Sequence, residues 1–501
     1  MSQDSYFIGI DFGTQGVRCS VVDQDGQFIS VKESSYRIHF PEPGQATQKP
    51  LEWIDSFEAA LTGCLSELPE SLKSRIAGLS VCATSSTVIA VDKEGRPLAD
   101  AILWMDNRAK AEAEQINSGE YELLKYCGGD VSVEWLIPKT LWIKRHMPGV
   151  YNQSYKIVEQ LDFINHYLTG RWAASVCQAT CKGNYINGNS EIEEYYFKQI
   201  GLEDYRNKLN RNVLKLGDEV GVLKPELSKK FGLPRDLPVY QGGIDAHVSM
   251  LGLGVCRPGD MGVIMGTSFV HLMLSEVPIY KRSIWGPYCD AIIPGLYCIE
   301  GGQVSAGSIT KWFLNEFNIA GENPYMLMAQ KAKEVPIGSK GLITLDFFQG
   351  NRTPYKNPNA KGVFYGLTLN HNRADIYRSI MEGIAYGTRN IIETVCGDDV
   401  AVNNIMACGG VTKNPLWLQI IADVTDKPIT LTENSSNCGV LGCAVIAAVG
   451  SGEYKGYEEA VDAMVRYTEV IKPDKEAHRL YEPQYQKYLA LYEKLEDMMD
   501  S

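Results

Sequence analysis

The sequence lacks the features of an exported or membrane-embedded protein. No apolar run approaches the ~20 residues needed to span a bilayer, and no basic N-terminal segment precedes a long apolar stretch. The 13 cysteines form no CxxC pair and are scattered through apolar segments, as in a reduced cytoplasmic protein. Cys177 and Cys181 come nearest to a metal-binding pair. Because no histidine–cysteine partner set accompanies them, we expect both to pack in the core.

Positive charge is also scarce. The 48 lysines and arginines stand against 61 aspartates and glutamates, and the formal net charge of −13 disfavours a nucleic-acid-binding surface. The 45% of hydrophobic and 22% of charged residues are ordinary for a globular protein. At 501 residues the chain is long enough for two or more domains, each with its own core. We therefore expect a small-molecule substrate, with neither nucleic acid nor membrane as a partner.

A glycine-rich corner near the N-terminus is the first sign of ligand binding. An apolar strand ends at Asp11, and Gly13, Thr14 and Gly16 follow before a second apolar run, as in a β-hairpin. Such glycines let backbone N–H groups surround an anion, and a carboxylate beside them suits Mg²⁺. Asp11 could equally cap an ordinary turn. The corner is thus a candidate phosphate loop with a candidate magnesium ligand.

The same pattern begins again in the second half of the chain. A strand ends in Gly266, Thr267 and Ser268 and is followed by another strand, and a third glycine corner lies at Gly409 and Gly410. Two strand–turn–strand openings indicate a duplicated α/β unit with a cleft between the copies. We expect an N-terminal domain over 1–253 and a C-terminal domain over 254–501 with a helical tail.

The candidate phosphate loops at Gly13–Gly16 and Gly266–Ser268 come from opposite halves and could bind one nucleotide between them. Phosphoryl transfer requires such an arrangement. Asp245 follows a glycine pair at a strand end and is the candidate acceptor of a substrate hydroxyl proton, although it could also cap the helix that follows. Four polar residues at loops or strand ends could bind a sugar, and each also has an ordinary structural explanation: Thr84, Ser85, Lys182 and Glu300. Lys182 could be a solvated surface lysine, and Glu300 could cap the glycines after it.

With these residues assembled, the sequence resembles the FGGY carbohydrate kinases over nearly its whole length. The segment 362–382 fits the second signature of that family at every constrained position, through Gly362 to Leu367, Asp375-Ile376 and Ser379 to Glu382. In the first signature Pro138, Lys139 and Trp142 are in place, but Thr140 stands where the family usually has an apolar residue. The resemblance implies an α/β fold of two ribonuclease H-like domains, as in actin- and hexokinase-type ATPases, that close over ATP and a sugar or polyol. It also implies that the first domain binds sugar and phosphate and the second binds nucleotide.

The resemblance also implies roles for individual residues. Asp245 corresponds to the catalytic base, and Asp11 to the magnesium-associated aspartate, with Asp245 also near the metal. The nucleotide-contacting set implied by the resemblance comprises Gly13, Thr14, Gln15, Arg18, Gly266, Thr267, Ser268, Gly307, Lys311, Gly409, Gly410 and Asn414. Many family members carry glutamine where this chain has Lys311.

The branch of the family is indicated by the sugar-site residues. Thr84-Ser85 departs from the Arg-Glu pair of glycerol kinases and the Met-His pair of xylulose kinases. The run 285–303 is similar to ribulokinase-type members, in which a lysine and a glutamate corresponding to Lys182 and Glu300 contact the ketose. We therefore expect a cytoplasmic, ATP- and Mg²⁺-dependent kinase of a pentulose such as ribulose.

Other readings of the sequence stay open. The acceptor could be another ketose or polyol, such as xylulose, a branched pentulose, erythrulose, erythritol or a linear autoinducer. Two substrates that differ by one methylene group or one epimeric centre can be separated by only ~1–3 kcal/mol of contacts with the pocket. A different class would be an actin-like or chaperone-type ATPase that couples nucleotide state to a protein partner. Members of the family are often dimers, so a homodimer is one expectation.

Overall fold

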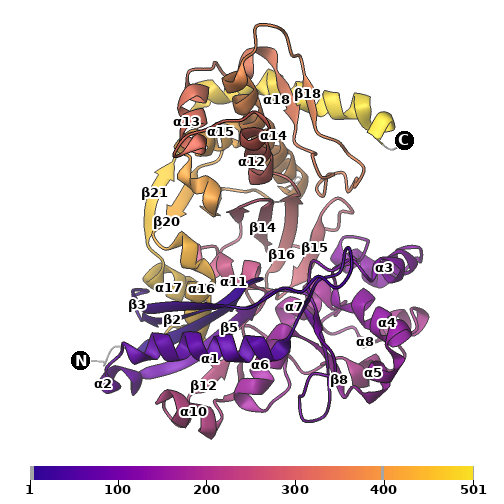
Figure 1. The fold of residues 1–501 in the computed structure, drawn as a ribbon, viewed down its shortest axis with the longest axis vertical. Coiled ribbons are helices and arrows are strands. Elements are labelled where there is room, and N and C mark those ends of the chain that lie inside the picture. The colour runs from indigo at the N-terminus through magenta and orange to yellow at the C-terminus, as the bar shows by residue number, and fades with distance from the viewer. Residues whose placement is uncertain (1–4, 397–399, 500–501) are drawn as a thin grey trace.

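Two large β-sheets organise the chain, which a computed structural model describes for residues 5–396 and 400–499 (Figure 1). The first sheet has the strand order β11-β12-β5-β1-β2-β3. Strand β1 runs antiparallel to β2 and parallel to β5, so the predicted N-terminal hairpin is confirmed. The bounds are β1 Tyr6–Phe12, β2 Gly16–Asp23, β3 Phe28–Ser35, β5 Ile76–Ala83, β11 Glu219–Val222 and β12 Pro238–Tyr240.

The second sheet repeats this arrangement with the order β15-β16-β14-β13-β19-β20-β21. Strand β13 runs antiparallel to β14 and parallel to β19, just as β1 does with β2 and β5. The strand–turn–strand pattern that repeats in the sequence therefore corresponds to a repeated sheet topology. The protein has the expected α/β fold of two similar halves. The bounds are β13 Asp260–Met265, β14 Phe269–Ser275, β15 Trp285–Cys289, β16 Tyr297–Gln303, β19 Asn404–Cys408, β20 Ile429–Thr432 and β21 Tyr467–Ile471.

Helices flank both sheets (Figure 1). In the first half they are α1 Pro50–Ser66, α2 Glu70–Lys73, α3 Lys110–Asn117, α4 Leu136–His146, α5 Pro148–Gln153, α6 Gln160–Thr169, α7 Val176–Lys182, α8 Ser190–Gln199, α9 Tyr205–Lys208, α10 Pro225–Phe231 and α11 Asp245–Gly252. In the second half they are α12 Gly307–Glu316, α13 Pro324–Lys333, α14 Arg373–Cys396, α15 Pro415–Thr425, α16 Cys438–Gly450, α17 Tyr457–Met464 and α18 Lys475–Met499. Within the described ranges, no helix combines the length and apolarity needed to cross a membrane.

Short strands and 3₁₀ turns complete the architecture. A four-stranded sheet in the first half is formed by β4 Thr47–Gln48, β6 Val88–Val91, β7 Ala101–Ile102 and β8 Lys156–Glu159. Two further strand pairs are β9 Ala174–Ser175 with β10 Val213–Leu214, and β17 Ile343–Leu345 with β18 Val363–Tyr365. The 3₁₀ turns are η1 Glu122–Cys127, η2 Ser339–Gly341, η3 Gly410–Lys413 and η4 Ser435–Asn437.

The C-terminal tail differs from the prediction in one element. It was expected to be helical, but Tyr467–Ile471 forms the edge strand β21 between the helices α17 and α18. This segment pairs antiparallel with β20 and contains the β-branched residues Thr468, Val470 and Ile471, which favour a pleated strand. The pairing partner, and not the local charge pattern, decides the structure here.

Helix α16 connects the two halves. It follows the second sheet in sequence, but it packs on β1 and β5 of the first sheet and against α11. Figure 1 shows α16 and α11 together beside the first sheet. Gly442 makes the contact with α11 possible, because a Cβ added there would lie 2.1 Å from the carbonyl oxygen of Val248. The helix therefore joins the second half of the chain to the first sheet.

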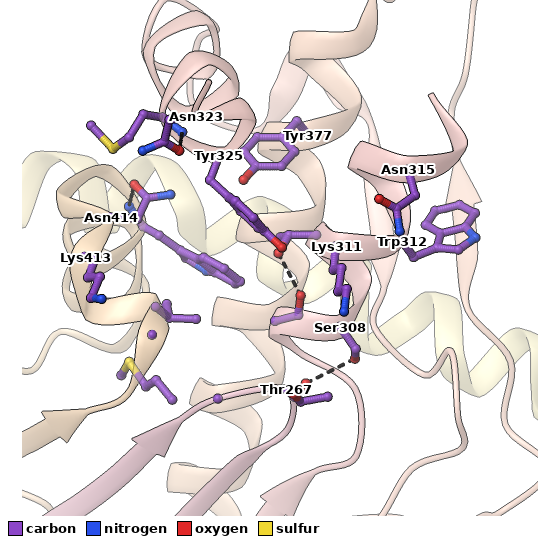
Figure 2. A pocket seen from close by; sticks show the side chains of 18 of the residues that line it. Thr267, Ser308, Lys311, Trp312, Asn315, Asn323, Tyr325, Tyr377, Lys413 and Asn414 are labelled. Atoms are coloured by element: carbon purple, nitrogen blue, oxygen red, sulfur yellow. Dashed lines mark hydrogen bonds between the residues drawn. The ribbon is translucent and has the colours of Figure 1, made fainter. Parts of the chain in front are cut away.

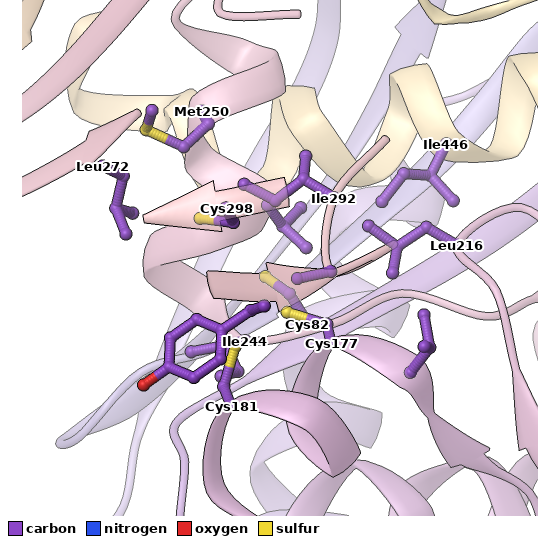
Figure 3. Close-up of a cluster of buried hydrophobic side chains, with 14 of the residues drawn as sticks. Cys82, Cys177, Cys181, Leu216, Ile244, Met250, Leu272, Ile292, Cys298 and Ile446 are labelled. Atoms are coloured by element: carbon purple, nitrogen blue, oxygen red, sulfur yellow. The ribbon is translucent and has the colours of Figure 1, made fainter. Parts of the chain in front are cut away.

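A buried core continues from one half into the other. Figure 3 shows part of it, where Cys82 and Ile244 of the first half lie near Cys298 and Ile446 of the second. All 13 cysteines are free, and most are buried, as predicted for core residues. The expectation that Cys177 and Cys181 lack a histidine partner is wrong. His247 Nε2 lies 3.5 Å from Cys181 Sγ, a contact between α11 and α7 that sequence spacing does not reveal.

Candidate active site

The N-terminal glycine corner is held in place by side chains from outside the hairpin. The N–H of Gly13 donates to the carbonyl oxygen of Gly16 at 3.0 Å, and the Tyr36 hydroxyl donates to the carbonyl of Gly13 at 2.5 Å. The indole N–H of Trp104 donates to Thr14 Oγ1 at 3.1 Å, so this tryptophan supports the corner. Gln15 is exposed at the tip. These contacts give the corner one fixed conformation, as a phosphate loop requires.

Arg18 is engaged within the protein. Its Nη1 donates to the carbonyl oxygen of Ser436 at 2.7 Å, and its Nη2 forms a 2.9 Å ion pair with Glu33. Ser436 lies in η4, just before α16. In this structure Arg18 thus ties the first hairpin to the start of the connecting helix, and its contact with nucleotide stays a prediction.

Two carboxylates from different elements influence each other where β1 ends and α11 begins. Asp11 Oδ1 accepts a hydrogen bond from Cys82 Sγ at 3.3 Å, and a Cβ added to Gly439 of α16 would lie 2.4 Å from Asp11 Oδ2. Asp245 is the first residue of α11, and the cap of that helix is Ile244, so the N-cap alternative is wrong. Burial, and next the negative charge of Asp11, raise the pKa of Asp245 to about 7.

These two side chains have the chemistry of a divalent-cation site. Burial also raises the pKa of Asp11, so the folded protein resists having both groups ionised. A hard cation with oxygen ligands, such as Mg²⁺, would offset the two negative charges. Asp11 and Asp245 therefore fit the magnesium that a phosphoryl-transfer enzyme uses.

Lys182 and Glu300 meet across the interface between the halves. Lys182 ends α7, and its Nζ lies 3.8 Å from Glu300 Oε2 and 5.3 Å from the ring centroid of Trp135. The Lys182 side chain is only 14% exposed, so the surface-lysine alternative is wrong. Glu300 lies on β16 and is 7% exposed.

The state of Glu300 leaves it ready to bind a ligand. Burial opposes its ionisation, but the charges of Lys182, then His247 and Arg352, outweigh this and hold the pKa of Glu300 below its usual value. Among the residues that the structure describes, Glu300 Oε2 has no hydrogen-bond partner. An ionised, buried oxygen without a partner is costly. It is the kind of acceptor that a substrate hydroxyl could satisfy.

The loop at Thr84 and Ser85 is largely occupied by internal contacts. Thr84 is buried and its hydroxyl donates to Gln160 Oε1 at 3.1 Å, whereas Ser85 is partly exposed. The next residue, Ser86, donates to Glu159 Oε1 at 2.8 Å, and its carbonyl accepts from Lys139 Nζ at 2.9 Å. Sequence reasoning missed this supporting network, although Lys139 belongs to the first family signature.

A large cavity in the second half is lined by half of the predicted nucleotide residues. It has a volume of about 1060 Å³, in the upper range for small-molecule sites (Figure 2). Six predicted residues line it: Gly266, Thr267, Gly307, Lys311, Gly410 and Asn414. Ser268 and Gly409 are absent from its lining. The carbonyl of Thr267 accepts from the Ser308 hydroxyl at 3.1 Å, so the second glycine corner is tied to the start of α12.

Aromatic side chains that sequence reasoning missed form much of the cavity wall. Trp312, Tyr325, Tyr377 and Trp417 come from four different helices, α12 to α15. Figure 2 shows Tyr325 and Tyr377 close together, with Lys311 extending toward the Thr267–Ser308 corner. Flat apolar walls beside a lysine suit a base and its phosphates. No sequence spacing connects these four positions, because each lies on a separate helix.

Comparisons with known proteins agree along the whole chain. The family models for the FGGY carbohydrate kinases match residues 6–252 with the N-terminal domain and residues 261–451 with the C-terminal domain. An FGGY carbohydrate kinase domain-containing protein from Xenopus laevis is 31% identical over 98% of this chain and 96% of its own length. A ribulokinase from Halalkalibacterium halodurans is 32% identical over 97% of this chain and 94% of its own length.

A solved structure gives the same result for the fold. The xylulose kinase from Rhodospirillum rubrum superposes with a TM-score of 0.89 at 27% identity, covering 99% of this chain and 100% of that one. The paired phosphate-type corners and the nucleotide-sized cavity are thus found in a chain whose relatives are sugar kinases. This protein belongs to the FGGY family of carbohydrate kinases and is an ATP-dependent carbohydrate kinase.

Proposed function

We propose that this kinase phosphorylates a hydroxyl of a pentulose, with ribulose as the first choice. The observation that carries the proposal is the buried Glu300 Oε2, which lacks a hydrogen-bond partner among the described residues and lies 3.8 Å from Lys182 Nζ. Relatives named ribulokinase, at 30–32% identity, support the same branch. Xylulose kinase is the name of a structural relative, so that ketose is the nearest competitor.

The proposed sugar site combines one acceptor, one donor and one apolar wall. The Glu300 carboxylate accepts hydrogen bonds from sugar hydroxyls, and the Lys182 ammonium donates to a hydroxyl or carbonyl oxygen. Trp135, whose ring lies beneath Lys182 Nζ, offers an apolar face to the C–H groups of the sugar. A site built to hydrogen-bond a hydroxyl rejects analogues that lack it by as much as ~10⁴-fold.

Asp245 is the proposed catalytic base. It accepts the proton of the sugar hydroxyl while that oxygen forms a bond to the γ-phosphorus, and the bond from this phosphorus to the β–γ bridging oxygen breaks to release ADP. A pKa raised to about 7 suits a group that must accept a proton near neutral pH. The corners at Gly13–Gly16 and Gly266–Ser268 would hold the phosphates from opposite sides.

Magnesium is a proposed partner of the same carboxylates. Asp11 and Asp245 would hold it, because their charges oppose each other in the folded protein. When bound, the cation neutralises negative charge on the phosphates. We also propose 1–253 and 254–501 as the two domains, with the strands of the first large sheet ending at Tyr240 and those of the second beginning at Asp260.

An acceptor panel tests the substrate. ADP release is measured with ATP and Mg²⁺ on both enantiomers of ribulose and xylulose, on branched pentuloses, erythrulose, erythritol, glycerol and a linear autoinducer. We expect the highest kcat/KM with a ribulose. A higher value for xylulose or for a polyol would overturn the choice of substrate and leave the kinase assignment intact.

The role of Asp245 is tested separately with Asp245→Asn. Because positioned acid–base groups contribute about 10²- to 10⁴-fold, we expect kcat to fall by that factor while ADP still binds. Asp236→Asn is the matched control, since Asp236 is exposed in the turn before β12. Near-full turnover by Asp245→Asn would exclude this residue as the base.

A further inference from the structure

Two thiols meet where the second sheet adjoins the connecting helix. Cys408 is the last residue of β19, Cys438 is the first residue of α16, and their Sγ atoms lie 4.0 Å apart. Cys408 is 3% exposed, whereas Cys438 is partly exposed. One residue of the pair is therefore partly open to solvent, and the other is enclosed.

The neighbours of both cysteines belong to the active site. Cys408 is followed by Gly409 and Gly410, and Gly410 lines the nucleotide cavity. Cys438 is followed by Gly439, which packs against the Asp11 carboxylate. The thiol pair thus lies between the nucleotide loop and the carboxylates proposed for magnesium, and it takes no part in the chemistry described above.

The two thiols differ in reactivity. Cys438 begins a 13-residue helix, and the positive end of a helix dipole stabilises a thiolate. Contact with Cys408 lowers the pKa of Cys438, although burial opposes the shift. The same contact, together with burial, raises the pKa of Cys408. Cys438 is therefore the attacking thiol and Cys408 the resolving thiol.

We propose that Cys408 and Cys438 form a reversible modification site, where a low-molecular-weight disulfide oxidises the pair and switches the kinase off. The Cys438 thiolate attacks one sulfur of the disulfide, which gives a mixed disulfide and expels one thiolate. Cys408 then loses its proton and attacks the Cys438 sulfur, which releases the second thiol. Overall the two cysteines lose two protons and two electrons, and the small disulfide is reduced to two thiols.

The bridge would act on both ligand-binding elements. A disulfide needs sulfur atoms about 2.05 Å apart, so the Cys408 and Cys438 side chains must approach each other from the present Sγ–Sγ separation of 4.0 Å. This movement displaces Gly409 and Gly410 on one side and Gly439 on the other. It also ties the second sheet covalently to the helix that lies on the first sheet, which hinders closure of the halves.

The test uses the full chain and oxidised glutathione. After incubation, peptide mapping by mass spectrometry identifies linked cysteines, calorimetry measures Mg·ADP affinity, and dithiothreitol is then added. We expect a Cys408–Cys438 linkage and an ADP affinity about tenfold lower or more, both reversed by dithiothreitol. Cys438→Ser should abolish the linkage and the affinity loss, and its affinity before oxidation should match the wild type.

Matched controls separate this pair from other thiols. Cys289 and Cys396 are partly exposed, so Cys289→Ser and Cys396→Ser should respond to oxidised glutathione as the wild type does. Cys408→Ala checks the resolving thiol and should stop at the mixed disulfide on Cys438. The proposal fails if no linkage between the two cysteines forms, if the linked protein binds Mg·ADP normally, or if Cys438→Ser loses affinity on oxidation as the wild type does.

Discussion

At the scale of single residues, Asp11 and Asp245 oppose the stability of the protein that contains them. Burial raises the pKa of both carboxyl groups, and the negative charge of Asp11 raises the pKa of Asp245 further. Ordinary core positions avoid such pairs, because a buried charge without a counter-ion is costly. The proposed roles in catalysis and magnesium binding would explain why both carboxylates are present, as is common where activity and stability compete.

The first prediction concerns pH and stability. The pKa of Asp245 rises from its ordinary 3.8 to about 7 on folding, so the folded state binds more protons than the unfolded state within that window. The contribution of Asp245 to stability therefore falls as pH rises through the window. We therefore compare the melting temperatures of Asp245→Asn and the wild type in metal-free buffer. Their difference should shift in favour of the variant as the pH rises from about 5 to about 8.

Calorimetric melting with Asp236→Asn as the control measures this difference. Asp236 is exposed, so its substitution should follow the wild type at every pH. A difference in melting temperature between Asp245→Asn and the wild type that stays constant from about pH 5 to about pH 8 would contradict the raised pKa of Asp245.

The second prediction concerns the Lys182–Glu300 pair. Lys182→Met leaves the buried Glu300 carboxylate without its closest cation, so the KM for the ketose should rise by about tenfold or more. Mg·ADP affinity should not change, because neither residue lines the nucleotide cavity. Steady-state kinetics and calorimetry measure the two quantities, and Lys198→Met, at an exposed position of α8, is the control. An unchanged KM would remove Lys182 from the sugar site.

Single residues also show where sequence reasoning stops. The glycine corners and Asp245 were found because each lies at a strand end with a recognisable local pattern. The contact between Lys182 and Glu300, the approach of His247 to Cys181, and the cavity walls formed by Trp312 and Trp417 all join separate elements. Such contacts depend on how loops and helices meet in space, and local periodicity carries no information about that.

At the scale of elements, α16 makes the closest contacts between the halves. Apolar and small residues lie on all sides of this helix, and 10 of its residues, from Gly439 to Ala448, are buried. It touches β1 and β5 on one side and α11 on the other. Its place on the first sheet could not be predicted, because the helix lies far from that sheet in sequence. Similarly, β21 was missed because its strand structure depends on pairing with β20.

The third prediction tests this packing with Gly442→Ala. The new Cβ would lie 2.1 Å from the carbonyl oxygen of Val248, and backbone atoms cannot easily move away. We expect a loss of about 1–3 kcal/mol in the free energy of unfolding and reduced turnover. Gly149→Ala is the matched control, since Gly149 is also helical and a Cβ there meets nothing within 4 Å. Equal melting temperatures for the two variants would contradict the close helix contact.

At the scale of the whole molecule, the cavity proposed for the nucleotide lies in the second half, whereas the proposed sugar site lies between the halves. The nucleotide cavity is lined entirely by residues of the second half, from Met265 to Trp417, whereas Asp245 and Lys182 come from the first half. Phosphoryl transfer requires the terminal phosphate to lie within bonding distance of the sugar hydroxyl. We therefore expect the halves to draw together when both substrates are present, as in other two-domain kinases.

The fourth prediction follows from this separation. Small-angle X-ray scattering should give a smaller radius of gyration with Mg·ADP and the ketose together than with either ligand alone. The Cys408–Cys438 disulfide, if formed beforehand, should abolish the decrease. An unchanged radius in the reduced ternary complex would mean that the two substrates meet without closure of the halves.

The position of α16 also has a consequence for synthesis of the protein. The first sheet is complete once Tyr240 has been made, but the helix that covers β1 and β5 ends only at Gly450. A growing chain on the ribosome must therefore carry an uncovered apolar sheet face through nearly half of its translation. A fragment that stops after residue 253 keeps that face open permanently, and we expect it to aggregate or to recruit chaperones unless residues 438–450 are supplied as a separate peptide.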